Sequence, residues 1–80
     1  METKVAVLSI ILNKPDNVDK VNQTLKAYRD YIIGRMGIPY REKNINIICI
    51  AMDAPQDKIS AISGKLGNLD GVTSKVTYSA

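Results

Sequence analysis

The sequence predicts an α+β domain with a ferredoxin-like βαββαβ plait, in which a four-stranded antiparallel sheet carries two helices on one face. Two uninterrupted apolar runs are typical of strands buried on both faces, and two other segments repeat apolar residues at helical spacing. Glycine- and proline-bearing or alternating segments fall at the two positions where such a plait has its edge strands, which tolerate proline. The 80 residues suit one domain, assigned to residues 1–80.

The first strand is predicted over Val5 to Leu12, a β-branched run that only Ser9 interrupts. It ends at a turn-forming Asn-Lys-Pro-Asp, whose last residue, Asp16, is placed to cap a helix. We expect that helix from about Asn17 to Tyr31, because an otherwise polar segment carries apolar residues at helical spacing. These residues are Val18, Val21, Leu25, Tyr28 and Ile32.

The second strand is predicted in the run Gly34 to Arg41, which packs two glycines, a proline and two arginines into eight residues. Glu42-Lys43-Asn44 follows as a hairpin tip, where asparagine tolerates the left-handed conformation of a tight turn. The third strand, Ile45 to Met52, shows no alternation of apolar and polar residues. Its two faces are therefore both apolar, as expected of a central strand.

The second helix begins near Pro55, which suits a first turn, with Asp53 nearby as a possible cap. Its apolar stripe is Ile59, Ile62, Leu66 and Leu69, interrupted by Gly67 and Asn68. Asp70-Gly71 makes a turn, and the fourth strand, Val72 to Tyr78, alternates strictly. With right-handed crossovers the first and third strands are central, and the second and fourth are edges.

One apolar face of this sheet has no helix to cover it. One face of the central strands carries Val5, Val7, Ile11, Ile45 and Ile47, and the other carries Leu8, Ile10, Leu12, Ile48 and Ile50. The edges add Met36, Ile38 and Tyr40 on one side of the second strand, Arg35 and Arg41 on the other, and a polar Thr73, Lys75 and Thr77 on the fourth. An apolar centre within a polar rim is typical of a subunit interface.

We therefore expect a homo-oligomer, either a dimer or a tetramer built from symmetric dimers. The expected interface residues are Val5, Val7, Ile11, Arg35, Arg41, Ile45 and Ile47. The alternative is a monomer in which a longer helix covers more of the sheet.

Composition argues against several classes of function. The chain has no histidine and one cysteine, so we expect no disulfide, metal site, cofactor or catalytic residue within one subunit, and no enzyme activity. Cys49 is interpreted as a small buried hydrophobe. A net charge of +3 is spread along the chain, which does not indicate nucleic-acid binding. The first apolar run is too short for a membrane span and lacks a signal-peptide pattern, so a cytoplasmic location is expected.

Arg35 and Arg41 have two interpretations. As exposed edge residues they keep the strand soluble and set the register of a partner. Alternatively they form an anion site, in which Gly34 and Gly37 let a small carboxylate ligand such as an amino acid approach the backbone. In that hypothesis Asn13 and Asp16 of a neighbouring subunit close the site.

The spelling Gly34-x-x-Gly37 is also that of the loop with which KH domains clamp nucleic acid. That loop joins two helices, however, and Ile38-Pro39-Tyr40 cannot begin one. RNA recognition modules of the same plait stack bases on aromatic residues of the central strands, and both predicted central strands lack them.

Two segments resemble a known family, the regulators of the iron-only hydrogenase system. These are Ile33-Gly34-Arg35-Met36-Gly37-Ile38-Pro39-Tyr40-Arg41-Glu42-Lys43 and the later Gly64-Lys65-Leu66-Gly67-x-Leu69-x-Gly71-Val72. The resemblance implies an ACT-like regulatory domain, similar in fold to the C-terminal domain of nickel-responsive repressors. Such domains associate through their sheets and bind small effectors at subunit interfaces.

The nickel-binding histidines of those repressors have no counterpart, so nickel sensing is not implied. No DNA-binding segment precedes Val5, so we do not expect this chain alone to read an operator. The expected partners are a second copy, a small effector and a protein of the hydrogenase system. The alternative function is a protein interaction or scaffold module without a small-molecule ligand.

Overall fold

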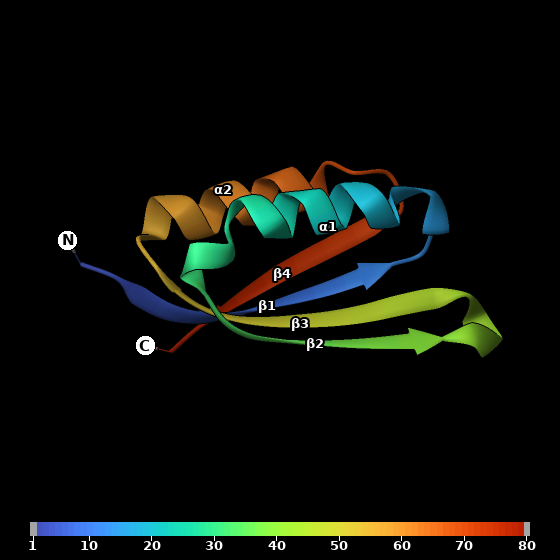
Figure 1. Cartoon of the computed structure of the whole chain (residues 1–80), viewed down its shortest axis with the longest axis horizontal. Helices are drawn as coiled ribbons and strands as arrows, with labels where there is room; N and C mark the ends of the chain where they lie inside the picture. Colours follow the sequence, from blue (N-terminus) through green and yellow to red (C-terminus); the bar gives the residue numbers. More distant parts are fainter. Residues whose placement is uncertain (1, 80) are drawn as a thin grey trace.

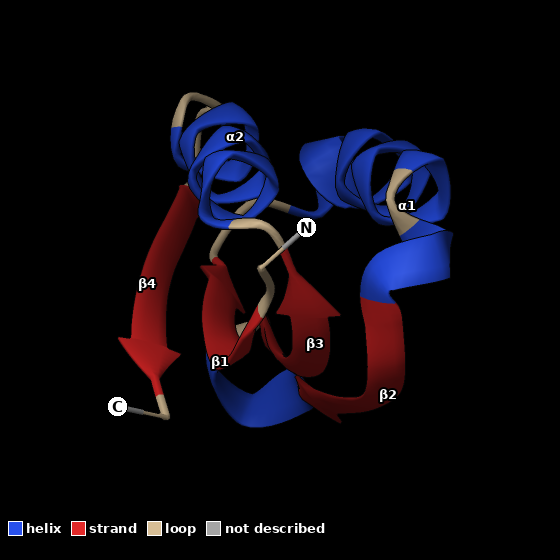
Figure 2. Ribbon diagram, turned by 90° about the vertical axis from the view of Figure 1, so that its left-hand side faces the viewer, coloured by secondary structure: helices blue, strands red, loops and turns tan. Residues whose placement is uncertain are grey.

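The computed structural model describes residues 2–79 and has the predicted order of elements. The strands are β1 (Lys4–Leu12), β2 (Ile32–Tyr40), β3 (Ile45–Ala54) and β4 (Val72–Tyr78), and the helices are α1 (Val18–Ala27) and α2 (Gln56–Gly67). The sheet is antiparallel with the order β2-β3-β1-β4. Both helices lie side by side on one face, and none of the described residues forms a helix over the opposite face (Figures 1 and 2). The predicted ferredoxin-like plait is therefore confirmed.

The core lies between the helices and one face of the sheet. Every second residue of the central strands points into it: Ala6, Leu8, Ile10 and Leu12 from β1, and Ile48, Ile50, Met52 and Ala54 from β3. The helices supply Val21, Leu25, Ile59, Ile62 and Leu66, and all five are fully buried. Burial of such an aliphatic side chain stabilises the fold by about 1.5–3 kcal/mol, so this layer holds both helices on the sheet.

The first helix is shorter than predicted. It ends at Ala27, and a 3-10 turn at Arg29–Tyr31 replaces its expected last turn. The Tyr31 N–H donates to the Tyr28 carbonyl at 3.0 Å, the tighter i to i−3 pattern of such a turn. Ile32, which was assigned to the helix stripe, is the first residue of β2. The apolar residues kept their helical spacing past Ala27 because Tyr28 and Tyr31 at this turn and Ile32 directly after it still pack on the core.

The two predicted helix caps are wrong. Asp16 lies inside a 3-10 turn, Pro15–Asn17, and α1 begins after Asn17 without a side-chain cap. Asp53 lies within β3, which continues to Ala54 rather than ending at Met52, because its last residues still pair with the start of β1. Pro55 itself occupies the N-cap of α2.

Two turn residues adopt the left-handed backbone conformation. Asn44, at the predicted hairpin tip, has φ 54°, and Gly71, in the predicted turn before β4, has φ 77°. The hairpin turn also contains a 3-10 turn at Arg41–Lys43. The β2–β3 hairpin extends past the end of β1, so its tip projects from the molecule (Figure 1).

Candidate functional site

The helix-free face of the sheet, which we call the open face, is apolar over β2, β3 and half of β1. The pairing places Met36 beside Cys49, Ile38 beside Ile47, and Tyr40 beside Ile45. Val5 and Val7 of β1 remain 44% and 43% exposed, and Met36 remains 54% exposed. Single exposed apolar residues are ordinary on protein surfaces, whereas a contiguous set across three strands is typical of an interaction site.

The opposite flank of the open face is polar. Ile11 pairs with Thr73, Ser9 with Lys75, and Val7 with Thr77, so β4 presents hydroxyls and one ammonium group beside the apolar strands. The open face therefore has an apolar part, over β2, β3 and the neighbouring residues of β1, and a polar flank on β4, as predicted. Of the predicted interface residues, Val5, Val7, Ile11, Ile45 and Ile47 share the open face.

Arg35 lies on the other side of the sheet. It pairs with the buried Ile50, and its Nη2 donates a hydrogen bond to Oδ1 of Asn22 on α1 at 2.9 Å. Gly37 and Pro39 follow on the same side, opposite Ile48 and Asn46. Arg35, Gly37 and Pro39 line a cavity of about 250 Å³ between α1 and β2, together with Val18 and Asn22 of α1. We call it the helix-side cavity.

The predicted ligand residues do not form one site within a single chain. Arg35 lines the helix-side cavity with Gly37, and it also lines a shallow depression on the open face with Gly34. Arg41 lies in the hairpin turn beyond the end of β2. The turn with Asn13 is also distant from Arg35. Arg35 pairs with Ile50 of β3, whereas Leu12, which precedes Asn13, pairs with Asn46, and these two β3 residues are four positions apart. At about 3.3 Å per residue, that separation is roughly 13 Å.

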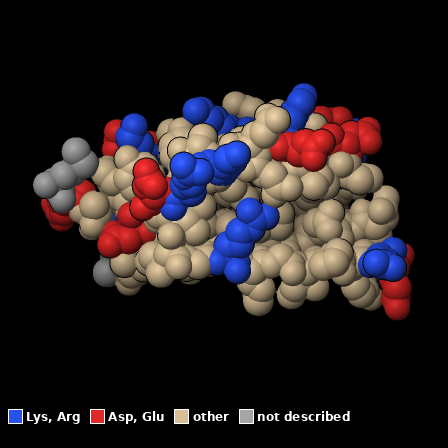
Figure 3. Space-filling view, in the orientation of Figure 1, with Lys and Arg blue, Asp and Glu red and all other residues tan. Residues whose placement is uncertain are grey.

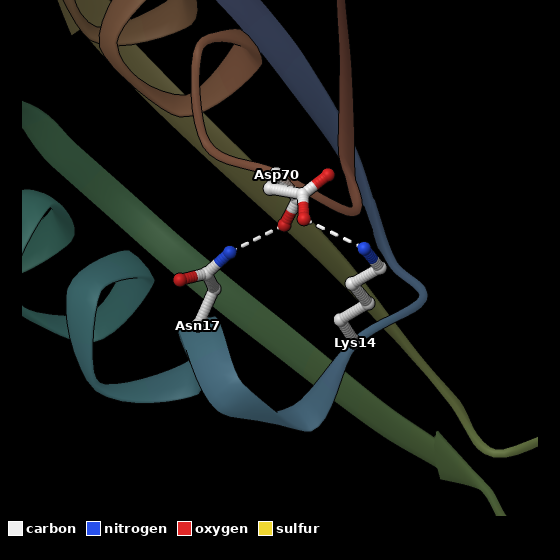
Figure 4. Close-up of polar contacts among 3 residues, drawn as sticks. All are labelled: Lys14, Asn17 and Asp70. Carbon is white, nitrogen blue, oxygen red and sulfur yellow. Dashed lines mark hydrogen bonds and ion pairs between the residues drawn. The ribbon is translucent and has the colours of Figure 1, made fainter.

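The turn that contains Asn13 and Asp16 is joined to the turn before β4. The Asn13 N–H donates to the Gly71 carbonyl at 2.7 Å, Lys14 Nζ contacts Asp70 Oδ2 at 2.6 Å, and Asn17 Nδ2 donates to the Asp70 carbonyl. Figure 4 shows Asp70 between the side chains of Lys14 and Asn17. These contacts tie the start of α1 to the end of α2.

The contact between Lys14 and Asp70 changes the acidity of both side chains. Their hydrogen bond, reinforced by the opposite charges, lowers the pKa of Asp70 below its ordinary value and raises the pKa of Lys14 above its own. Both side chains are largely exposed. This pair is a structural contact between two turns, and it lies apart from the residues that line the helix-side cavity.

Sequence reasoning selected Arg35 and Gly37 but missed Asn22 and Asn46, which line the same cavity. Asn22 follows Val18 by four residues on α1, so it lies on the helix face that reaches β2. Asn46 alternates with the same set of β3 residues as Ile48 and Ile50, and sequence reasoning gave it no role. A polar residue in an otherwise apolar set was the signal for Asn46, since a buried polar group usually has a partner or a function.

Within residues 2–79, no group of histidine, cysteine and acidic side chains is placed to hold a metal ion. None of the helices there is both long and apolar enough to cross a membrane.

The fold defines a class of protein, the small α+β domains with a ferredoxin-like βαββαβ plait. Part of a formyltetrahydrofolate deformylase from Pseudomonas putida KT2440 has the same fold, with a TM-score of 0.67 and 13% sequence identity over 91% of this chain and 28% of that chain. At that identity, the similarity concerns the fold alone.

The sequence places the chain in a particular family. Residues 4–76 match the TM1266-like family, described as "Iron-only hydrogenase system regulator, putative", and the chain belongs to this family. The solved structure of the uncharacterized protein TM1266 from Thermotoga maritima is similar over 99% of this chain and 100% of that chain, with 32% identity and a TM-score of 0.95. No curated protein matches the chain.

Proposed function

We propose that this chain is a homo-oligomeric, non-enzymatic regulatory domain of an iron-only hydrogenase system and that it responds to a small effector. The observation that carries the proposal is the apolar open face. The regulatory role follows the description of the family, and the absence of histidine from the sequence removes the commonest general base.

The area of the open face supports self-association. The molecule measures 42 × 18 × 18 Å, so the whole face, polar flank included, projects over roughly 750 Å², of the same order as the roughly 800 Å² of accessible surface that each partner contributes to a stable interface. The strand residues of the apolar part are uncharged except Asp53, which pairs with Val5 at one end of the face, and the polar flank on β4 lies along one side. A second copy offers the same apolar surface, as a two-fold interface requires.

The substitution Ile38→Lys tests the proposal. Ile38 is 46% exposed and lies within the apolar part on β2, beside Ile47 of β3, and a buried ammonium group without a partner is costly. We expect sedimentation velocity to show an oligomer for the natural protein at tens of micromolar and a shift of at least tenfold in the concentration of half-dissociation for the variant. Native mass spectrometry under anaerobic conditions then reports the number of subunits and any retained small molecule.

Thr73→Lys is the matched control, because it adds the same charge to the polar flank of the same face. It is expected to leave association nearly unchanged. A natural protein that sediments as a monomer, or equal effects of the two substitutions, would contradict association through the apolar part of the open face.

A protein interaction module without a ligand is the alternative function, and the exposed β2 edge favours it. An edge strand has unpaired backbone groups that can pair with a strand of a partner. Purification of a stoichiometric protein partner, without a retained small molecule and with β2 protected from hydrogen exchange, would support this alternative.

A further inference from the structure

The helix-side cavity continues into a second one along the groove between α1 and β2. The second cavity, of about 320 Å³, shares Arg35 and Asn22 with the first and is also lined by Lys26 and Arg29. We call the two together the α1–β2 groove. Arg35 stands where they meet, so the groove has one end with three cations and another that is mostly apolar.

The basic end is built to receive negative charge. The hydrogen bond from Arg35 to Asn22 uses one guanidinium nitrogen and holds the group against α1, which leaves its other N–H donors for a ligand. Of the described residues that line the two cavities, none is acidic. In Figure 3, basic side chains gather in the middle of this face, and acidic side chains lie toward its two ends.

The apolar end has space that the fold does not fill. Its walls include Val18, Pro39 and Ile48, with the Asn46 carboxamide as a neutral polar group. Gly37 lies in this part of the groove, and a Cβ added there would meet no atom within 4 Å. The backbone of Gly37 does not have positive φ. Neither strain nor crowding within one chain therefore requires a glycine, and its effect is to keep the cavity open.

The size and the charge of the groove together define a ligand. Its apolar cavity alone, of about 250 Å³, is smaller than the roughly 300–1,000 Å³ of sites for drug-sized molecules, so this end suits a short organic body. Guanidinium groups bind carboxylate and phosphate through paired hydrogen bonds. An ammonium group would find no carboxylate among the lining residues described above, which disfavours amino acids.

We propose that the α1–β2 groove binds a small organic anion without an ammonium group. The anionic group, a carboxylate or a phosphate ester, lies at Arg35 between Lys26 and Arg29, and a short apolar body extends over Gly37 toward Asn46. The inference rests on the proposed function because it names the chemical class of the effector. It departs from the amino-acid ligand expected from the sequence.

A panel of ligands with the same branched apolar end tests the chemical class. Calorimetry with the natural protein compares 4-methyl-2-oxopentanoate, 3-methylbutyl phosphate, leucine and 4-methylpentanol. We expect one of the two anions to bind at least tenfold more tightly than both leucine and the alcohol, and the better anion identifies carboxylate or phosphate as the preferred group. Inorganic phosphate and acetate, which lack the apolar body, are expected to bind at least tenfold more weakly than the better anion.

Two variants test the location. Arg35→Gln removes the central cation, and Gly37→Val fills the apolar end; each is expected to weaken binding of the better anion at least tenfold. Gly64→Val is the control, because Gly64 lies on α2 and an added Cβ there also meets no atom within 4 Å. Circular dichroism verifies folding, and Arg35→Gln alone decides the location if Gly37→Val does not fold.

Several results would overturn the inference. They are no binding of either organic anion, binding of leucine as tight as that of the anions, binding of inorganic phosphate as tight as that of the ester, or unchanged binding by Arg35→Gln. These outcomes are separate from sedimentation. An oligomer that binds neither anion contradicts anion binding in the groove and leaves the proposal of association unaffected. A monomer that binds an anion through Arg35 contradicts association and supports the groove.

Discussion

Gly71 shows how one residue can be fixed by two independent requirements. Its φ of 77° lies in the left-handed region, and a Cβ at this position would lie 2.7 Å from Cγ and 2.8 Å from Cβ of Lys14. The left-handed conformation costs other L-residues about 1–2 kcal/mol. The contact adds to this cost, because the nearest Lys14 atoms belong to the base of the side chain and not to its flexible end.

The substitution Gly71→Ala is therefore expected to lower the free energy of unfolding by at least about 1–2 kcal/mol. Urea denaturation followed by circular dichroism measures this change. Gly64→Ala is the matched control in α2, where alanine is expected to stabilise the helix by about 0.5–1 kcal/mol. Equal unfolding midpoints for the two variants would show that the turn relaxes without cost.

The pair formed by Lys14 and Asp70 predicts a pH dependence. Because the folded state lowers the pKa of Asp70 below 3.8, the carboxylate contributes stability above that pH and loses it as the pH falls through the folded value. Because the folded state raises the pKa of Lys14 above 10.5, the ammonium contributes below that pH and loses its contribution as the pH rises further.

Asp70→Asn is thus expected to be less stable than the natural protein between about pH 5 and 9, with the difference disappearing toward pH 2. Chemical denaturation at pH 7 and at pH 2 measures it. Since the pair is exposed, 1 M salt should also reduce the difference. A difference that persists at pH 2 would mean that the substitution acts through packing or the backbone.

At the scale of elements, the strands were more predictable than the helices. The limits of β4 and the first residue of β3 agree with the sequence, because strict alternation and turn-forming residues mark them directly. The end of α1 was mispredicted because Tyr28 and Tyr31 contact the same core from a 3-10 turn. A hydrophobic stripe reports which residues face the core, and it does not report where the backbone changes its pitch.

The lining of the α1–β2 groove could not be predicted in full, because its residues come from α1, β2 and β3 and meet only in the folded structure. Arg35 and Gly37 stood out because their residue types are unusual in a strand. Asn22 and Asn46 became candidates only when α1 was seen to lie over β2 and the start of β3. The side of the sheet that carries the helices also had to come from the structure, since both phases of the central strands are apolar.

For the whole molecule, Cys49 can report on association. It lies half-buried on β3 between Met36 and Ser9 of the neighbouring strands, within the apolar part of the open face. If a second copy covers this part, the thiol of Cys49 becomes less accessible to solvent. We expect alkylation of Cys49 by iodoacetamide to be at least tenfold slower in the assembled natural protein than in Ile38→Lys.

Thr73→Lys should retain the slow alkylation, and protein unfolded in urea sets the rate of the free thiol. Mass spectrometry of quenched samples measures the reaction. Equal rates in the natural protein and in Ile38→Lys, with the natural protein sedimenting as an oligomer, would place the subunit boundary away from Cys49.

The strand order has a consequence for the way the chain folds. β1 is the first strand to be synthesised, yet both of its neighbours in the sheet, β3 and β4, lie far along the chain. Pairings between distant segments slow folding because the intervening chain must first be ordered. The hairpin of β2 and β3 can form locally, whereas β1 obtains its second neighbour only after β4 has left the ribosome. The pairing of β1 is therefore completed last, although this strand is made first.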